Sequence, residues 1–202
     1  AGADLGWMKR ASAYGEAENR ADARRLAAML KAIDECPKPT IARVHGAALG
    51  GGVGLVAACD IVIATPAALF GLTEVRLGLV PGVVSPFVLR AIGQRQARRY
   101  FVTGERFDAA QALAIGLVHE VVAEDALDAR IETVLAEILK GGPVAQGSCK
   151  ELIRFTAAMP QGGSLMTEGT VGFIAAARAG DEGKEGIAAF LEKRAPGFRQ
   201  DR

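Results

Sequence analysis

The strongest constraint on this chain is a glycine-rich stretch, HGAALGGGVGL, at residues 45–55. It follows an apolar segment, TIARV, with the composition of a β-strand, and it runs into GLVAAC, whose small apolar residues favour a buried helix. Three consecutive glycines, Gly50 to Gly52, therefore coincide with the expected start of a helix. The first turn of a helix carries backbone N–H groups without partners in the helix, so bare backbone here leaves those donors open.

Phosphate binding and tight packing are the competing explanations for the glycines. A P-loop is excluded because no Lys-Ser/Thr pair follows Gly52. A dinucleotide-binding fingerprint fits better, since Gly52, Gly54 and Ala57 match G-x-G-x-x-A, and Glu74 lies twenty residues after Gly54. However, seven residues separate TIARV from Gly52, whereas the fingerprint leaves its strand directly. Close packing explains one or two glycines but not a run of three. Both interpretations are disfavoured but stay open.

The helix start itself offers a third explanation. Without Cβ atoms at residues 50–52, a carbonyl oxygen can approach the free N–H groups closely, and the helix macrodipole favours negative charge there. One more N–H from elsewhere would complete an oxyanion hole. Removing one donor from such a site typically costs ~3 to 4 kcal/mol of transition-state stabilisation. The stretch therefore predicts a site that holds a developing oxyanion.

Composition excludes several classes of protein. The 24 basic and 23 acidic side chains give a net charge of +1, so we expect neither nucleic acid nor an anionic membrane as a partner. The longest apolar run, residues 55–72, is interrupted by Asp60 and Pro66 and does not predict a membrane span. We expect a soluble protein without a metal site. The widely spaced cysteines, without a C-x-x-C pair, are predicted to be buried, reduced packing residues: Cys36, Cys59 and Cys149.

The remaining pattern alternates helices with short strands. In DARRLAAMLKAIDECP four apolar residues recur at helical spacing, which predicts a helix that buries Leu26, Met29, Leu30 and Ile33. Strands are predicted for TIARV, DIVIAT, LFGL and LVHEVV, and residues 84–103 are predicted to be helical. Strand, helix and strand in this order favour parallel pairing through a crossover connection.

The last part of the chain has a different character. From about residue 125 it reads as helices that are broken at glycines and prolines and are too few to bury their own apolar faces. We therefore divide the chain into a core at residues 1–142 and a C-terminal helical region at residues 143–202. We expect this region to pack on the core or on a neighbouring subunit.

Four motifs, in order along the chain, carry a resemblance to a known family. They are AGADL at 1–5, HGAALGGGVGLVAACD at 45–60, FGLTEVRLGLVPG at 70–82 and EGIAAFLEKRAPGF at 185–198. Together they resemble the crotonase, or enoyl-CoA hydratase/isomerase, superfamily. The resemblance implies an α/β fold, a crotonase-like spiral of ββα turns with a C-terminal helical trimerisation region. It also implies a homotrimer or a dimer of trimers.

The resemblance further implies an acyl-CoA thioester as substrate, with its oxygen held by two backbone N–H groups. Coenzyme A is then part of the substrate, and no separate cofactor is implied. Carried over by position, the two donors belong to Gly51 and Ala3. The positions that match coenzyme A contacts are Ala1, Asp4, Leu5, Phe190 and Lys193.

Of the family's two acids, this sequence keeps one. Glu74 matches the acid that transfers a proton at the carbon next to the thioester, whereas Gly54 stands where the second acid would be. Without the resemblance, an ordinary exposed loop carboxylate would be the simpler interpretation of Glu74. Proton transfer favours a pKa raised by an apolar surround, which we expect from four neighbours in sequence. These are Phe70, Leu72, Val75 and Leu77.

Chemistry then indicates hydration of a 2-enoyl-CoA, with Glu74 taking a proton from water and returning it to the α-carbon. The chain looks most similar to methylglutaconyl-CoA and carboxygeranoyl-CoA hydratases, whose substrates carry a methyl branch at the β-carbon. We expect the missing side chain at Gly54 to leave room for that branch. The alternatives are Δ3,Δ2-enoyl-CoA isomerisation, which needs one base, and a non-catalytic crotonase-like scaffold.

The chain begins inside the first of the four motifs. We therefore expect that an N-terminal part of the family's fold, with further strands, is missing from this sequence. The resemblance favours a cytoplasmic location, and a mitochondrial one stays open because a targeting segment would precede Ala1.

Overall fold

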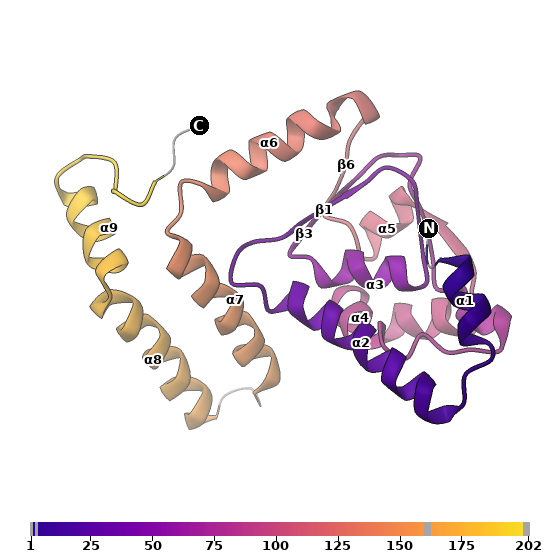
Figure 1. Ribbon diagram of the computed structural model, residues 1–202. Coiled ribbons are helices and arrows are strands. Elements are labelled where there is room, and N and C mark those ends of the chain that lie inside the picture. The colour runs from indigo at the N-terminus through magenta and orange to yellow at the C-terminus, as the bar shows by residue number, and fades with distance from the viewer. Residues whose placement is uncertain (1, 3, 160–162, 200–202) are drawn as a thin grey trace. The chain divides into compact units, whose positions relative to one another are not determined.

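The computed structural model describes residue 2, residues 4–159 and residues 163–199 (Figure 1). Its internal contacts divide the chain into two compact units. Residues 1–34 and 40–131 form the first unit, and residues 35–39 and 132–202 form the second. The domain boundary expected after residue 142 remains a proposal.

The first unit is built from successive strand-strand-helix turns. The first turn contains β1 (Ile41–Val44), β2 (Ala47–Leu49) and α3 (Gly51–Ala58). The second contains β3 (Ile61–Ala64), β4 (Leu69–Gly71), the 3-10 helix η1 (Thr73–Leu77) and α4 (Ser85–Thr103). β1 pairs in parallel with β3, and β2 pairs in parallel with β4, so each turn stacks on the one before it. The crossover predicted from the sequence is therefore present.

A third, less regular turn completes the two small sheets. It contains β5 (Arg106–Asp108), α5 (Ala109–Ala114) and β6 (Glu120–Val121). β5 pairs antiparallel with β4, and β6 pairs in parallel with β3. The Asp108 side chain accepts a hydrogen bond from the Gln111 N–H and so caps α5. The 3-10 helix η2 (Glu124–Ala126) and α6 (Leu127–Ile138) follow.

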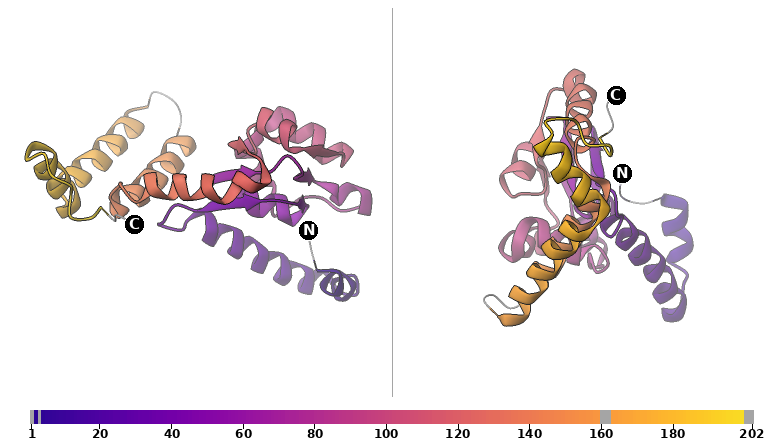
Figure 2. Two further views of the ribbon diagram at one scale, coloured as in Figure 1. Left: turned by 90° about the horizontal axis from the view of Figure 1, so that it is seen from above. Right: turned by 90° about the vertical axis from the view of Figure 1, so that its left-hand side faces the viewer.

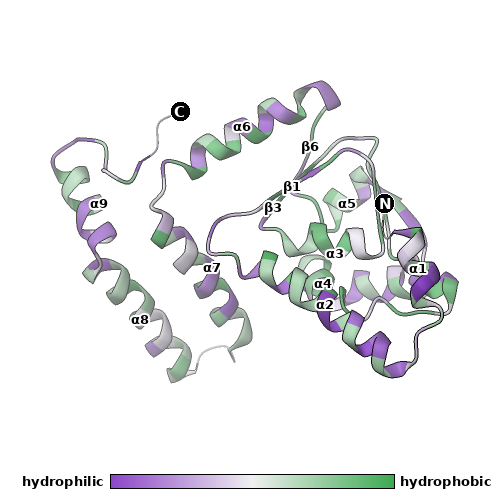
Figure 3. Cartoon of the chain, in the orientation of Figure 1, coloured by the Kyte–Doolittle hydropathy of each residue, from purple (hydrophilic) through white to green (hydrophobic). Residues whose placement is uncertain are grey.

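Two helices precede the first turn, α1 (Leu5–Ala11) and α2 (Glu16–Asp34). The predicted face of α2 is partly wrong. Leu30 is completely buried, whereas Met29 is 44% exposed. Figure 3 shows the alternation of hydrophilic and hydrophobic residues along this helix. The residues that pack on the core from α2 are Leu26, Leu30 and Ile33.

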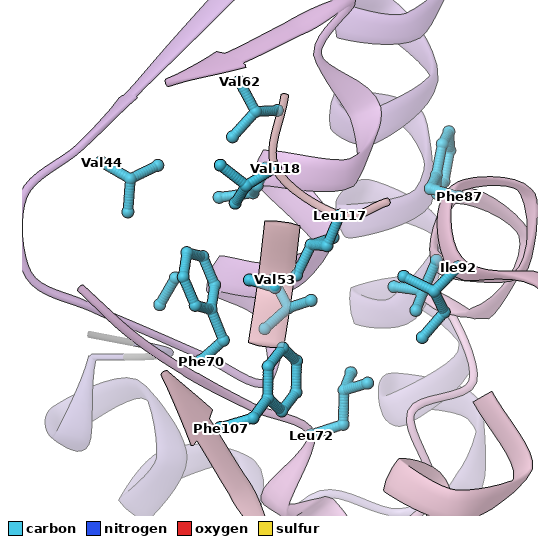
Figure 4. Close-up of a cluster of buried hydrophobic side chains, with 14 of the residues drawn as sticks. Val44, Val53, Val62, Phe70, Leu72, Phe87, Ile92, Phe107, Leu117 and Val118 are labelled. Carbon is cyan, nitrogen blue, oxygen red and sulfur yellow. The ribbon is translucent and has the colours of Figure 1, made fainter. Parts of the chain in front are cut away.

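The core forms around α3, which is apolar on all sides and is therefore buried rather than amphipathic. Its Val53 is fully buried in one cluster with Phe70, Phe107 and Leu117 (Figure 4). β2, α2 and α4 also contribute residues to this cluster, and α3 packs against all three. The position of the glycine-rich helix is therefore set by contacts with several elements.

The predicted strands are confirmed, with two differences. LVHEVV forms only the two-residue strand β6, and β2 was not predicted as a separate strand. α4 extends over the predicted segment but is interrupted at Gly93, whose φ of 71° and ψ of 161° are not helical. A glycine tolerates this conformation because it has no Cβ.

The second unit contains α7 (Pro143–Ala158), α8 (Ser164–Ala179) and α9 (Asp181–Leu191). α8 packs against α7 and leads into α9 (Figure 2). The Phe155 and Phe173 rings meet with centroids 5.8 Å apart. The Glu182 carboxylate of α9 accepts hydrogen bonds from the Val144 and Ala145 N–H groups at 3.0 and 2.7 Å. It thereby satisfies free donors at the start of α7.

All three cysteines are free, but the prediction that they are buried is wrong: Cys36 and Cys59 are partly exposed, and Cys149 is exposed. Among the described residues, no helix has the length and apolar character needed to cross a bilayer.

The corrected α2 face predicts unequal effects of two neighbouring truncations. Leu30→Ala removes a fully buried side chain and should lower the free energy of unfolding by about 2–5 kcal/mol. Met29→Ala changes an exposed side chain and should alter it by less than about 1 kcal/mol. Urea denaturation followed by circular dichroism measures both. Equal losses would show that the helix buries the face first expected from the sequence.

Candidate active site

The N-terminus of α3 is shaped by the backbone of Gly50. This N-cap residue has a φ of 53° and a ψ of −116°, a conformation that favours glycine. Its N–H donates to the Gly71 carbonyl at 2.8 Å, and its carbonyl accepts from the Val53 N–H at 3.0 Å. The first bond ties the helix start to the end of β4, and the second begins the helix. Gly50 therefore fixes the direction in which the first turn of α3 presents its amides.

Two of these amides are open. Within the described residues, the N–H groups of Gly51 and Gly52 have no hydrogen-bond acceptor, as the first turn of a helix without a side-chain cap predicts. The N-terminal motif lies beside them. A Cβ atom placed on Gly2 would overlap the carbonyl group of Leu49, and one placed on Gly51 would lie 3.2 Å from the Gly2 carbonyl oxygen. The first and second motifs of the sequence thus meet at this helix end.

Glu74 lies against the same helix end. A Cβ atom on Gly50 would be 3.1 Å from Oε1 and 3.5 Å from Cδ of Glu74, so the carboxyl group fits there because residue 50 has no side chain. Oε2 of Glu74 is buried and has no hydrogen-bond partner among the described residues. Burial raises the pKa of the Glu74 carboxyl, and a hydrogen bond from its own backbone amide offsets part of this rise. A raised pKa suits a carboxyl group that both accepts and donates a proton.

The short 3-10 helix that carries Glu74 is held at its C-terminal end and along one side. Gly78 ends it in the left-handed conformation, with a φ of 71°, and the Leu79 N–H donates to the Glu74 carbonyl at 3.0 Å. Gly104, with a φ of 61°, lies against it: a Cβ there would be 2.9 Å from Val75 and 3.2 Å from the Arg76 side chain. The position of the carboxylate thus depends on contacts far away in the sequence.

The expected apolar surround of Glu74 is only half correct. Phe70 and Leu72 are completely buried, but Val75 and Leu77 are 40% and 62% exposed. Residues in a 3-10 helix point about 120° apart, so neighbours of Glu74 cannot all face the same side. Burial of the carboxyl raises its pKa, and the two completely buried neighbours, Phe70 and Leu72, are the part of the expected apolar surround that the structure retains.

Gly54 has a different role from the one expected. A Cβ atom on Gly54 would overlap the Val84 side chain, 2.8 Å from its Cβ, and would lie 3.5 Å from Cδ1 of Leu30. The missing side chain therefore leaves no open volume at this position, and the expectation of room for a methyl branch is wrong. The reason is the close approach of α3 to the chain at the start of α4, which only a residue without a side chain permits. No sequence signal marked Val84, although a glycine inside a helix indicates close packing.

The sequence argument against a dinucleotide site, that no strand leads directly into the glycines, is also wrong, because β2 ends at Leu49. The geometry of the site gives a better argument. A pyrophosphate binds at a helix N-terminus through its negative charge, but the Glu74 carboxyl already lies there. Two adjacent anions would repel each other, which disfavours a dinucleotide.

The residues expected to contact coenzyme A are spread over both units. Asp4 caps α1, where its Oδ1 accepts a hydrogen bond from the Trp7 N–H at 2.6 Å, and Leu5 is 79% exposed. Phe190 and Lys193, at the end of α9, belong to the second unit. Ala1 and Ala3 lie outside the described residues. The roles of these residues in binding stay predictions.

Within the described part of the chain, no three side chains of His, Cys, Asp or Glu are grouped so that they could hold a metal ion. The two histidines have structural contacts. His45 Nδ1 lies 3.1 Å from Nη1 of Arg43, and His119 Nδ1 accepts a hydrogen bond from the Val62 N–H at 3.0 Å. Glu74 is therefore the titratable side chain that the structure brings to the free amides of α3.

Comparisons with known proteins gave matches over nearly the whole chain. A family model described as enoyl-CoA hydratase/isomerase matches residues 1–201. An enoyl-CoA hydratase from Shewanella pealeana is 42% identical, with a TM-score of 0.90, over 97% of this chain and 73% of that one. AtuE from Pseudomonas aeruginosa is 37% identical, with a TM-score of 0.91, over 99% and 77%. The expected crotonase-like α/β fold is confirmed by these matches.

The raised pKa of Glu74 predicts how stability depends on pH. In the folded chain the carboxyl keeps a proton at pH values where the unfolded chain has released it, so its contribution to stability is lost as pH rises through the folded pKa. Glu74→Gln removes this loss and should raise Tm relative to the parent at pH 8, with a smaller difference at pH 4.

Glu105→Gln is the matched control. A hydrogen bond from Arg99 lowers the pKa of Glu105, so its contribution is present at neutral pH and is lost as pH falls through that lowered value. This variant should lower Tm at pH 8 and approach the parent in acid. Differential scanning fluorimetry at both pH values measures the pair. An equal loss of Tm at pH 8 in both variants would contradict the buried state of Glu74.

Proposed function

The chain belongs to the enoyl-CoA hydratase/isomerase family, and from this premise we propose that it hydrates a 2-enoyl-CoA thioester. The observation that carries the proposal is the half-buried carboxyl of Glu74, whose Oε2 has no hydrogen-bond partner among the described residues, against the helix end where Gly51 offers a free N–H. A base beside an oxyanion donor is the minimal equipment for forming and protonating an enolate.

In the proposed reaction the thioester oxygen accepts a hydrogen bond from the Gly51 N–H, with Ala3 as the expected second donor. Glu74 takes a proton from a water molecule, and the oxygen of that water forms a bond to the β-carbon. The electron pair of the carbon-carbon double bond moves toward the thioester, and its oxygen becomes anionic. Glu74 then returns its proton to the α-carbon, which gives a 3-hydroxyacyl-CoA and restores the carboxylate.

The charges of the site suit this sequence of steps. The negative charge leaves Glu74 at the moment when the thioester oxygen acquires one, so the site never holds two full anions. The positive end of the α3 macrodipole and its free amides favour whichever group carries the charge. The raised pKa of Glu74 brings its two protonation states closer in energy, as a group that both accepts and donates a proton requires.

A methyl-branched substrate, such as 3-methylglutaconyl-CoA, is a finer proposal. It now rests on the similarity of the sequence motifs to hydratases of branched acids, because Val84 fills the space next to Gly54. We keep this substrate as one arm of the activity test.

Isomerisation of a 3-enoyl-CoA to a 2-enoyl-CoA is the second candidate. The packing of Val84 at Gly54 favours it, since an apolar side chain stands where a second acid would hold water. Moving a proton between two carbons needs only one carboxyl group, and Glu74 supplies it.

Assembly as a homotrimer or a dimer of trimers also belongs to the proposal. The second unit leaves large apolar side chains exposed, which is typical of a surface covered by another chain. The most exposed of them are Leu165 (76%), Phe190 (80%) and Leu191 (73%).

Substitution of the acid tests the reaction. Glu74→Gln keeps the shape of the side chain but cannot accept the proton, so turnover should fall by about 100-fold or more. The assay follows 3-methylglutaconyl-CoA, crotonyl-CoA and a 3-enoyl-CoA by mass spectrometry. A mass gain of one water identifies hydration, and a product of unchanged mass identifies isomerisation. Activity within threefold of the parent would remove Glu74 from the mechanism, and a parent without turnover would favour a non-catalytic scaffold.

Substitution of the amide donor tests the oxyanion site. Gly51 is the first residue of α3, the position where a helix best tolerates proline, so Gly51→Pro removes one N–H and should keep the fold. We expect kcat to fall by about 100-fold. Gly51→Ala adds a side chain but keeps the N–H, so in this variant kcat should fall by less than about tenfold. Equal losses in the two variants would assign the effect to crowding against Gly2.

A further inference from the structure

The side chains of Glu74 and Val84 pack against successive turns of α3. The Glu74 carboxyl packs where Gly50 lacks a side chain, and the Val84 isopropyl group packs where Gly54 lacks one. The Gly54 N–H donates to the Gly50 carbonyl at 3.3 Å, so the two glycines are about one helical turn, or about 6 Å, apart along the axis. Glu74 and Val84 thus pack against two glycines that lie one turn apart on α3.

The space at Gly54 is already filled. Val84 is 3% exposed, and both its Cβ and its Cγ1 would overlap a Cβ at position 54. Leu30 closes the same space, with Cδ1 at 3.5 Å from that Cβ position. Any side chain at position 54 must therefore displace Val84, because protein interiors have almost no spare volume.

Resting on the proposed function, we propose that Val84 is a specificity-determining residue: its isopropyl group fills the space that a second acid on α3 would need and so limits the site to one carboxyl. Residues 54 and 84 then act as a pair, in which only one of them can carry a side chain at this contact. Glu74 alone must activate water and deliver the proton in hydration, whereas isomerisation already needs no second group. The balance between the two reactions is therefore set jointly by residues 54 and 84.

A double-mutant cycle at residues 54 and 84 tests the packing claim, that only one of the two can carry a side chain, without any substrate. Gly54→Ala should lower Tm by about 4 °C or more, because it adds a methyl group to a filled space. Val84→Gly removes the whole obstructing side chain at an N-cap, where glycine is tolerated. In the Val84→Gly background, where the obstruction is gone, Gly54→Ala should leave Tm unchanged or raise it by about 1–3 °C. If Gly54→Ala alone does not fold while Gly54→Ala/Val84→Gly does, that result equally supports the steric coupling of residues 54 and 84.

Gly172 provides the control for alanine in a helix. It lies within α8, and a Cβ there would meet nothing within 4 Å, so Gly172→Ala should leave Tm unchanged or raise it by about 1–3 °C. An equal loss from Gly54→Ala in the parent and the Val84→Gly background would overturn the pair.

The catalytic half compares Gly54→Glu/Val84→Gly with its isosteric partner, Gly54→Gln/Val84→Gly. The glutamate variant should raise the ratio of hydrated to isomerised product by at least about tenfold over the glutamine variant. It should also add an acidic limb to the pH profile of hydration, which an amide cannot do. Equal ratios in the two variants, with an active parent, would overturn the inference alone. Absence of turnover in the parent would instead overturn the proposed function on which it rests.

Discussion

The contact on which the site depends is the packing of the Glu74 carboxyl against the first turn of α3. It exists because Gly50 has no side chain and adopts a positive φ of 53°, so that Oε1 of the carboxyl lies only 3.1 Å from the position that a Cβ would take. The same conformation directs the Gly50 N–H to β4 and leaves the amides of Gly51 and Gly52 open. One backbone geometry therefore brings together a base and the donors for an anion.

This arrangement lowers the local stability of α3. Most helices begin with a Ser, Thr, Asp or Asn side chain that caps a free N–H, and loss of such a cap typically costs about 1 kcal/mol. α3 has no side-chain cap, and the nearest carboxyl group leaves Oε2 without a partner. The burial of apolar residues such as Val53 and Val56 offsets the loss. Unsatisfied groups in an otherwise well-packed region are typical of a functional site.

Much of the fold followed from local patterns. The strands at TIARV and DIVIAT and the cap at Asp108 were predictable because each depends on neighbours in sequence. β2 was not, since three residues give no measurable alternation. The exposure of Met29 also required the structure, because helical spacing defines a face only to within about one residue.

The candidate site was also predictable only in part. The sequence motifs identified Gly51 and Glu74, and the structure adds that the two residues meet at one helix end. The packing of Val84 at Gly54 joins residues thirty positions apart, and nothing near either of them in the sequence could indicate it. Contacts between elements decide such details, and local propensity does not report them.

The most direct test of the account is to watch the Gly51 amide while a thioester binds. The measurement is the amide proton resonance of Gly51 in ¹⁵N-labelled protein, titrated with butyryl-CoA and, separately, with coenzyme A that carries no acyl group. If the Gly51 N–H donates a hydrogen bond to the thioester oxygen, the amide proton resonance moves downfield with butyryl-CoA and not with coenzyme A alone. Equal shifts with both ligands, or no shift while other resonances report binding, would contradict the central claim.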